Sequence, residues 1–290
     1  MFTGAMVALV TPFQDGKIDF QTLDELIEFQ IENGIDAIVP VGTTGECPTL
    51  SHDEHKKVIE RVVKTVGGAV PVIAGAGSNS TAEAIELTAF SKKVGADASL
   101  QVCPYYNKPT QEGFYQHFKA IAEEIDLPMV LYNIPGRCGA GLTPETVARL
   151  AEIENIVAIK EASGSMDQIS EIASRCGITI LSGDDSMTLP IASLGGKGVI
   201  SVVANIVPAD VKAMTDLILE GDFTSALKWH KKLFTLSKGM LTLATNPIPV
   251  KAAMAMLNMC SEELRLPMTP LEDSKKAVLK QTLQDYGLLG

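Results

Sequence analysis

The sequence lacks long hydrophobic runs, regular cysteine spacing and a basic leader at its N-terminus. A membrane-spanning helix needs about 18 or more consecutive apolar residues, and no run reaches that length. The first residues have no basic region of the kind that opens a secretory signal peptide. The five cysteines are odd in number and form no C-x-x-C pair, which is typical of reduced thiols. We therefore expect a cytoplasmic protein without a membrane partner.

Motifs of several common enzyme classes are also missing. No G-x-G-x-x-G follows the first apolar run, and no Walker phosphate loop or Ser-His-Asp arrangement is present. His52 and His55 lie three residues apart, whereas the zinc-binding helix motif H-E-x-x-H places its histidines four residues apart. We therefore expect no metal site.

The charge balance is acidic, with 24 Lys and Arg against 35 Asp and Glu and a net charge of −11 at pH 7. An acidic protein is a poor partner for nucleic acid or an anionic membrane surface. An anionic small molecule is still a possible substrate, because a local cationic pocket can lie within an acidic protein. The 46% of hydrophobic residues is typical of a globular protein with a packed core.

What the sequence does contain is a regular alternation of short apolar runs and longer amphipathic segments. Continuous apolar strands are typical of a parallel sheet buried on both faces. Eight strand–helix units in about 220 residues predict a (β/α)₈ barrel over residues 1–221, with a doubly wound open sheet as the alternative. The predicted strands cover residues 5–10, 37–41, 70–74, 98–102, 129–132, 156–160, 178–181 and 198–201.

Residues 222–290 contain no strand pattern and are predicted to be a helical region that packs on the barrel. Two capping boxes mark the starts of earlier helices, one from Ser51 to Glu54 and one from Ser80 to Glu83.

The active site of such a barrel lies at the C-terminal ends of the strands, where Lys160 ends an apolar run. Apolar surroundings lower the pKa of a lysine, and its neutral amine can then attack a carbonyl carbon to form a Schiff base. The alternative is that Lys160 is simply paired with Glu161 or another carboxylate.

Two other strand ends could hold carboxylate groups. The turn at residues 42–46 combines the hydroxyls of Thr43 and Thr44 with backbone N–H groups, which suits a small carboxylate. Arg137, in a loop after the fifth strand, could hold a second one. The alternatives are an ordinary glycine-rich turn and a surface ion pair.

Tyr106 and Tyr132 are phenols at neighbouring strand ends and could transfer protons, although tyrosines also commonly line a barrel mouth. Two adjacent acids, Asp184 and Asp185, are only weak evidence for a metal site. We expect them to cap the next helix or to position substrate through the backbone.

Several segments together resemble the dihydrodipicolinate synthase family, which is part of the N-acetylneuraminate lyase superfamily of pyruvate-dependent class I aldolases. The resemblance extends over essentially the whole chain. The segments that carry it are residues 42–46, 104–109, 132–137, 159–162 and 246–251.

The resemblance implies a lyase that condenses pyruvate with L-aspartate 4-semialdehyde to 4-hydroxy-tetrahydrodipicolinate, at the opening of diaminopimelate and lysine biosynthesis. Lys160 would form the Schiff base with pyruvate, and no metal or organic cofactor would be needed. Tyr132 would act as general acid and base, relaying protons through Thr44 to Tyr106 of a neighbouring subunit. The substrate-binding residues would be Thr43, Thr44, Arg137, Gly183 and Val202.

The resemblance also implies a homotetramer, a dimer of dimers, with L-lysine as a possible feedback inhibitor. Glu83 is also the acid of the second capping box, so the alternative is that it only caps a helix and does not bind L-lysine. At Cys47-Pro48 and at Cys138 this chain departs from the small residues and the threonine that are common in the family. The residues that match the lysine site are His52, His55, Asn79, Glu83 and Tyr105.

Two other functions have to be weighed against this one. Another pyruvate-dependent aldolase, such as an N-acetylneuraminate or keto-deoxy sugar-acid lyase, would use the same lysine and tyrosine, but Arg137 and the Tyr105-Tyr106 pair favour the synthase. A non-catalytic binding barrel is disfavoured, because the candidate catalytic residues are all present.

Overall fold

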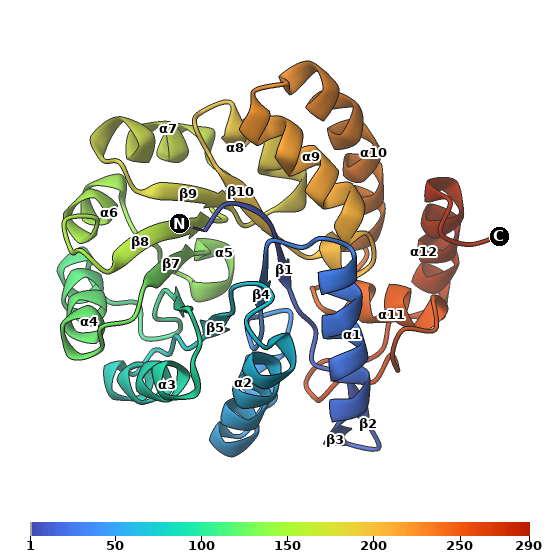
Figure 1. Cartoon of the computed structure of the whole chain (residues 1–290), viewed down its shortest axis with the longest axis horizontal. Coiled ribbons are helices and arrows are strands. Elements are labelled where there is room, and N and C mark those ends of the chain that lie inside the picture. Colours follow the sequence, from blue (N-terminus) through green and yellow to red (C-terminus); the bar gives the residue numbers. More distant parts are fainter. Residues whose placement is uncertain (1) are drawn as a thin grey trace.

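Eight parallel strands form the centre of the structure, a computed structural model that describes residues 2–290 (Figure 1). They are hydrogen-bonded in the order β4-β1-β10-β9-β8-β7-β6-β5, and a bridge between Ile38 and Val72 joins the two ends of this sheet. The predicted (β/α)₈ barrel is confirmed, and the open sheet is wrong. The strands are β1 (Gly4–Ala8), β4 (Ala37–Val39), β5 (Ile73–Gly75), β6 (Ala98–Val102), β7 (Met129–Asn133), β8 (Ile156–Glu161), β9 (Thr179–Ser182) and β10 (Gly198–Ser201).

Helices surround the strands as a ring, and the C-terminal helices lie on one side of it (Figure 1). Every predicted strand overlaps an observed one, because each strand of the barrel is buried and therefore coincides with an apolar run in the sequence. The helices between the strands are α1 (Phe20–Glu32), α2 (His52–Val66), α3 (Thr81–Val94), α4 (Gln111–Glu124), α6 (Pro144–Leu150), α7 (Met166–Arg175) and α8 (Thr188–Ala192). After β10 follow α9 (Pro208–Glu220), α10 (Phe223–Leu241), α11 (Ile248–Met256) and α12 (Asp273–Tyr286).

Apolar side chains fill both the inside of the barrel and the space between the strands and helices. Alternate strand residues such as Met6, Ile73 and Leu100 form the inner cluster. A larger cluster extends from β1 and α1 to α10, α11 and α12, so the C-terminal helices share a core with the barrel. The predicted boundary at residue 221 falls between α9 and α10, and residue 1 lies outside the described residues.

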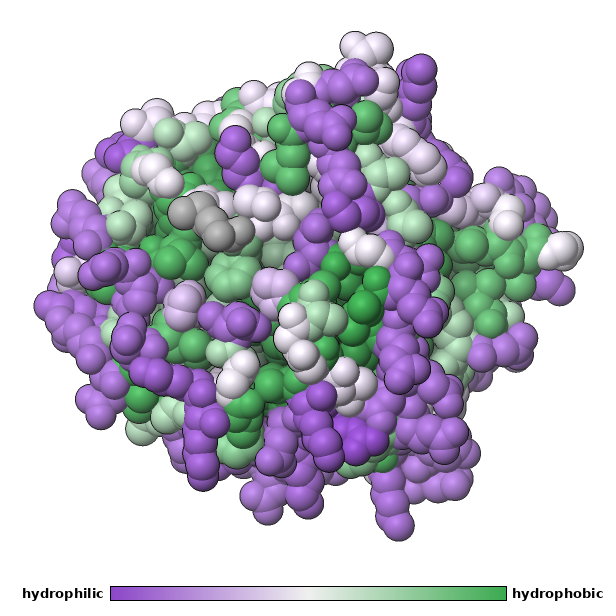
Figure 2. Space-filling view, viewed as in Figure 1, coloured by the Kyte–Doolittle hydropathy of each residue, from purple (hydrophilic) through white to green (hydrophobic). Residues whose placement is uncertain are grey.

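The outer rim of the face seen in Figure 2 is mostly hydrophilic, and hydrophobic residues gather toward its middle and over α12. No helix in residues 2–290 is both long and apolar enough to cross a membrane.

The helix-start signals were only partly correct. The capping box of α2 is complete, since Ser51 and Glu54 each accept a hydrogen bond from the other's backbone N–H. The box predicted for α3 is wrong, because the Glu83 carboxylate accepts a hydrogen bond from Ser78 Oγ (2.7 Å) and only Ser80 caps the helix.

Short elements at the strand ends were not predicted, because their backbone turns are too brief to leave a periodic pattern. They are the hairpin β2 (Phe13–Gln14) and β3 (Lys17–Ile18), the helix α5 (Pro135–Cys138), and the 3₁₀ turns η1 (Cys47–Thr49), η2 (Asp185–Met187) and η3 (Val203–Asn205).

Candidate active site

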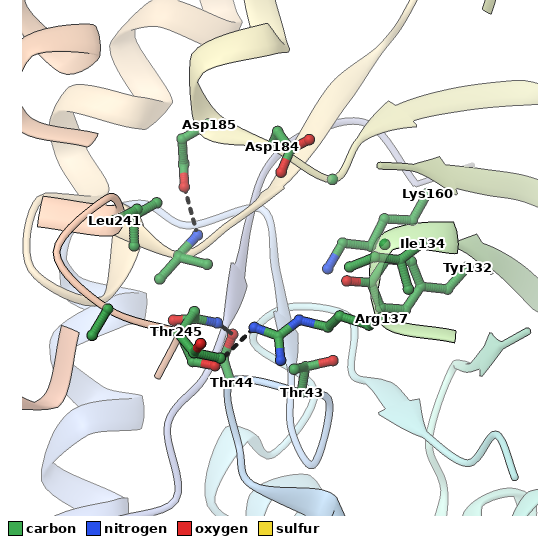
Figure 3. Close-up of a pocket in the computed structure, with 15 residues that line it drawn as sticks. Thr43, Thr44, Tyr132, Ile134, Arg137, Lys160, Asp184, Asp185, Leu241 and Thr245 are labelled. Carbon is green, nitrogen blue, oxygen red and sulfur yellow. Dashed lines mark hydrogen bonds between the residues drawn. The ribbon is translucent and has the colours of Figure 1, made fainter. Parts of the chain in front are cut away.

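A cavity of about 470 Å³ opens at the C-terminal ends of the strands, and side chains project into it from several sides (Figure 3). Seven residues predicted from the sequence line it, namely Thr43, Thr44, Tyr132, Arg137, Lys160, Gly183 and Val202. Residues from the C-terminal region also line it, among them Leu241, Thr245 and Asn246.

Lys160 lies on β8, directly beside Tyr132 of β7, because the two residues are partners in the strand register. Lys160 is 5% exposed, and its Nζ lies 4.1 Å from the centroid of the Tyr132 ring. Burial lowers the pKa of Lys160 to about 8, although the carboxylates of Asp184 and Asp185 act in the opposite direction. The neutral amine of Lys160 is therefore a minor form at pH 7, but it is far more populated than in an ordinary lysine.

Glu161 is not the partner of Lys160, which removes one alternative. Successive strand residues point to opposite faces, so Glu161 points away from the barrel interior. Its carboxylate accepts hydrogen bonds from Asn133 Nδ2 (3.0 Å), Gln168 Nε2 (3.1 Å) and the backbone N–H of Ser163 (2.7 Å).

The phenol of Tyr132 is buried beside Lys160, and its neighbouring hydroxyl is that of Thr43. Burial raises the pKa of Tyr132 above its usual value, opposed by Arg137 and by a hydrogen bond with the Thr43 side chain. Tyr132 is therefore protonated at neutral pH. The Thr44 hydroxyl instead accepts a hydrogen bond from Asn246 Nδ2 (2.9 Å). The structure thus corrects the expected contact between Tyr132 and Thr44.

The turn that carries both threonines has little steric freedom. A Cβ atom at Gly45 would lie 3.0 Å from Val41 Cα and 3.1 Å from Leu9 O, so only glycine fits there without a shift. The Gly45 carbonyl also accepts a hydrogen bond from Thr11 Oγ1 (2.7 Å). These contacts fix the turn against the segments that directly follow β1 and β4.

Arg137 lies in the short helix α5 rather than in an open loop. Its Nη2 donates to the backbone carbonyl of Asn246 (2.9 Å), and its guanidinium faces the cavity (Figure 3). Asn246 therefore contacts both Arg137 and Thr44. Sequence reasoning missed this role, because Asn246 is 202 residues away from Thr44 and has no local signal.

The expectation that Asp184 and Asp185 cap the next helix is wrong, because neither η2 nor α8 has a side-chain cap and the Asp185 carboxylate instead binds the start of η3. Its carboxylate accepts hydrogen bonds from Ser201 Oγ and from the N–H groups of Val202 (3.0 Å) and Val203 (3.3 Å). Over residues 2–290, no group of three or more His, Cys, Asp or Glu side chains could hold a metal ion.

Tyr106 does not reach the cavity of its own chain. It is 89% exposed and has a φ of 70° in the loop after β6. A second, largely apolar cavity of about 270 Å³ adjoins the first and shares Thr43 and Tyr132 with it. The departures at Cys47, Pro48 and Cys138 all line this second cavity.

Three of the five residues expected at a lysine site lie together. Asn79 Nδ2 donates to the Tyr105 carbonyl (3.1 Å), and Tyr105 lies close enough to Ser78 and Glu83 for both to affect the pKa of its phenol.

The two histidines expected there differ in their surroundings. His55 is buried with its Nε2 2.7 Å from the Gly75 carbonyl, and His52 is exposed at the start of α2.

A sequence model of the dihydrodipicolinate synthetase family matches residues 1–286. The chain belongs to this family. A 4-hydroxy-tetrahydrodipicolinate synthase from Pelobacter propionicus is 55% identical over 291 residues, covering 100% of both chains.

Two solved structures of the family with ligands are also similar to this chain. The dihydrodipicolinate synthase of Acinetobacter baumannii complexed with pyruvate is 44% identical, with a TM-score of 0.97 and 100% of both chains covered. The enzyme of Cyanidioschyzon merolae with lysine bound is 44% identical, with a TM-score of 0.96 and 99% of both chains covered.

Proposed function

We propose that this chain is a 4-hydroxy-tetrahydrodipicolinate synthase, which condenses pyruvate with L-aspartate 4-semialdehyde through a Schiff base on Lys160. Family membership and the full-length relative support the reaction. The observation that carries the mechanism is the buried amine of Lys160, 4.1 Å from the Tyr132 ring in a cavity that also contains the threonine turn and Arg137.

The first stage is formation of the imine. The neutral amine of Lys160 attacks C2 of pyruvate and forms a C–N bond, giving a carbinolamine. Tyr132 is protonated and donates the proton with which the C2 hydroxyl leaves as water. The hydroxyls and N–H groups of Thr43 and Thr44 bind the pyruvate carboxylate. The Acinetobacter relative was solved in complex with pyruvate, which supports pyruvate as the substrate.

The second stage forms the carbon–carbon bond. The deprotonated Tyr132 takes a methyl proton from the imine, which becomes an enamine. The enamine carbon then attacks the aldehyde of the semialdehyde, and Tyr132 returns the proton to the aldehyde oxygen, which becomes a hydroxyl. Arg137 binds the carboxylate of that substrate, and Gly183 and Val202 line the remaining wall. The amine of the bound product then displaces Lys160, closing the ring and restoring the free lysine. None of these steps requires a metal or an organic cofactor.

Protons move between Tyr132 and solvent through Thr43, whose side chain is the hydrogen-bond partner of Tyr132. The relay continues to Tyr106 of a second copy, because the exposed Tyr106 cannot serve its own cavity. The apolar cavity beside Thr43 has room for an aromatic ring from that copy. We propose the homotetramer built from two such dimers as the active assembly, in the cytoplasm, where the free cysteines would stay reduced.

L-Lysine is the proposed inhibitor, at a site formed by His52, His55, Asn79, Glu83 and Tyr105. The Cyanidioschyzon relative was solved with lysine bound, which supports L-lysine as a ligand. The Glu83 carboxylate suits the lysine ammonium group and the Tyr105 hydroxyl suits its carboxylate. Glu83→Gln should weaken inhibition by L-lysine without changing activity in its absence, and unchanged inhibition would remove Glu83 from the site.

The decisive experiment is to incubate the protein with pyruvate and sodium borohydride and to locate the reduced adduct by peptide mass. We expect it on Lys160, and Lys160→Met serves as the matched control. An unmodified Lys160 in folded protein would refute the mechanism and favour a binding barrel. Turnover with aspartate semialdehyde but not with N-acetylmannosamine then separates the synthase from the alternative aldolase.

A further inference from the structure

The C-terminal region contacts the threonine turn at a second place, outside the lining of the cavity. Lys251, on α11, is fully buried, and its Nζ lies 2.5 Å from Oε1 of Glu46. Glu46 is the last residue of the turn at residues 43–46 and is itself buried. Neither residue lines the cavity, so this ion pair does not belong to the reacting groups.

Each charge of the pair depends on the other. Apart from Lys251, Oε1 of Glu46 has no hydrogen-bond partner in residues 2–290, while Oε2 accepts from the backbone N–H of Arg265 (3.1 Å). Lys251 Nζ also donates to the Glu263 carbonyl (2.8 Å) and lies 4.2 Å from the Phe13 ring centroid. Removing one partner alone leaves an uncompensated buried charge, which is strongly destabilising, whereas removing both charges together is often nearly neutral.

The backbone of Glu46 is held in an unfavourable conformation. Its φ of 55° and ψ of 35° lie in the left-handed region, which residues other than glycine rarely adopt. Such a conformation persists only where the surroundings impose it. The side chain of Glu46 is fixed at both oxygens by residues of the C-terminal region, which supplies that constraint.

The conformation of Glu46 also determines where the threonines lie. The N–H of Glu46 donates to the Thr43 carbonyl (3.1 Å), and the N–H of Cys47 donates to the Gly42 carbonyl (3.3 Å). These two bonds close the turn. Any change of the Glu46 backbone therefore moves the hydroxyls and N–H groups that face the cavity.

We propose that Lys251 and Glu46 are positioning residues for pyruvate, and that their buried ion pair holds the turn at residues 43–46 in the shape that binds the pyruvate carboxylate. This rests on the proposed function, in which that turn binds pyruvate. The semialdehyde carboxylate binds at Arg137, on a different element, so the two substrates should respond differently when the pair is removed.

The test compares Lys251→Met, Glu46→Gln and the double variant with wild type in steady-state kinetics. The double variant contains no unpaired charge, so we expect it to fold and to melt near the wild-type temperature. Its kcat/KM for pyruvate should fall about tenfold or more, because turn contacts to the carboxylate are lost. Its kcat/KM for the semialdehyde should stay within about threefold of wild type.

Lys276→Met is the control, because it breaks the ion pair of Lys276 with Glu262 (2.7 Å) in the same C-terminal region, and neither of these residues contacts the turn through a side-chain hydrogen bond or ion pair. It should leave both kcat/KM values unchanged. Both single variants should be less stable than the double variant, since each leaves one buried charge unpaired.

A stable double variant with the wild-type kcat/KM for pyruvate would overturn the proposal. A double variant that does not fold would also overturn it, as would one whose kcat/KM values for pyruvate and for the semialdehyde fall equally. Each of these results would make the pair a purely structural feature. Borohydride trapping of pyruvate on the wild-type protein is a separate measurement: its failure would refute the Schiff-base mechanism itself.

Discussion

The pKa of Lys160 predicts how the first chemical step depends on pH. Only the neutral amine attacks pyruvate, and burial lowers the pKa of Lys160 from 10.5 to about 8. At pH 7 an ordinary lysine would be neutral in about 0.03% of molecules and Lys160 in about 9%, a difference of about 300-fold. Enamine formation should therefore rise about tenfold per pH unit below pH 8 and level off above it.

The assay is the exchange of pyruvate methyl protons with D₂O, followed by proton NMR. It requires the enamine but not the second substrate, so it isolates Lys160 chemistry. Pyruvate is kept far below KM, so that the rate reports the free enzyme. Lys160→Met gives the uncatalysed background.

Asp184→Asn tests the sign of the electrostatic effect. The Asp184 carboxylate raises the pKa of Lys160, so its removal should move the midpoint of the profile to lower pH. A wild-type rate that keeps climbing tenfold per pH unit up to pH 10 would refute the reasoning, because it would mean that Lys160 has an ordinary pKa.

Three further predictions follow from the site and its surroundings. Thr43→Val should lower kcat by about 10²-fold or more, whereas Thr44→Val should have a much smaller effect; equal losses in steady-state kinetics would contradict the relay through Thr43. The Tyr106→Phe and Lys160→Met variants, each inactive alone, should regain up to about a quarter of wild-type activity when they are unfolded and refolded together. About half of the dimers then contain one chain of each variant, and each such dimer has one complete site out of two. No recovery would show that Tyr106 does not act across subunits. A hydrogen bond from the Arg265 guanidinium lowers the pKa of Glu54 from 4.5 to about 2. The Glu54 carboxylate therefore stabilises the fold above pH 4.5, and this stabilisation disappears as pH falls toward 2. The urea midpoint of Glu54→Gln should fall less over that range than the urea midpoint of wild type.

Much of the fold could be predicted from local patterns. Apolar runs of strand length and N-capping residues are signals within a few residues of the elements they specify, and this is why all eight strands were found. Lys160 and Tyr132 could be predicted for the same reason, since each lies next to the C-terminal residue of its strand and a closed barrel brings such ends together.

The contacts that were missed depend on backbone turns or on distant parts of the chain. Which of two adjacent threonines faces Tyr132 depends on the backbone of the turn, where Val41 and Glu46 both have a positive φ that cannot be read from the residue type. Glu83 matches a capping box, but Ser78 is the closer donor once the loop has folded. Asn246 has a role only because the chain returns to the barrel mouth about 200 residues after the threonine turn.

The large sequence separation between the threonine turn and the residues that hold it affects how this protein is completed during translation. The threonine turn leaves the ribosome early, but two of the contacts that hold it come from residues 202 and 205 positions later, at Asn246 and Lys251. At about 5–20 residues per second, the nascent chain spends about 10–40 s without them. A prematurely terminated chain can contain every strand of the barrel and still lack a finished pyruvate pocket. Catalytic competence therefore arrives only with the final part of translation, which keeps incomplete chains from consuming pyruvate.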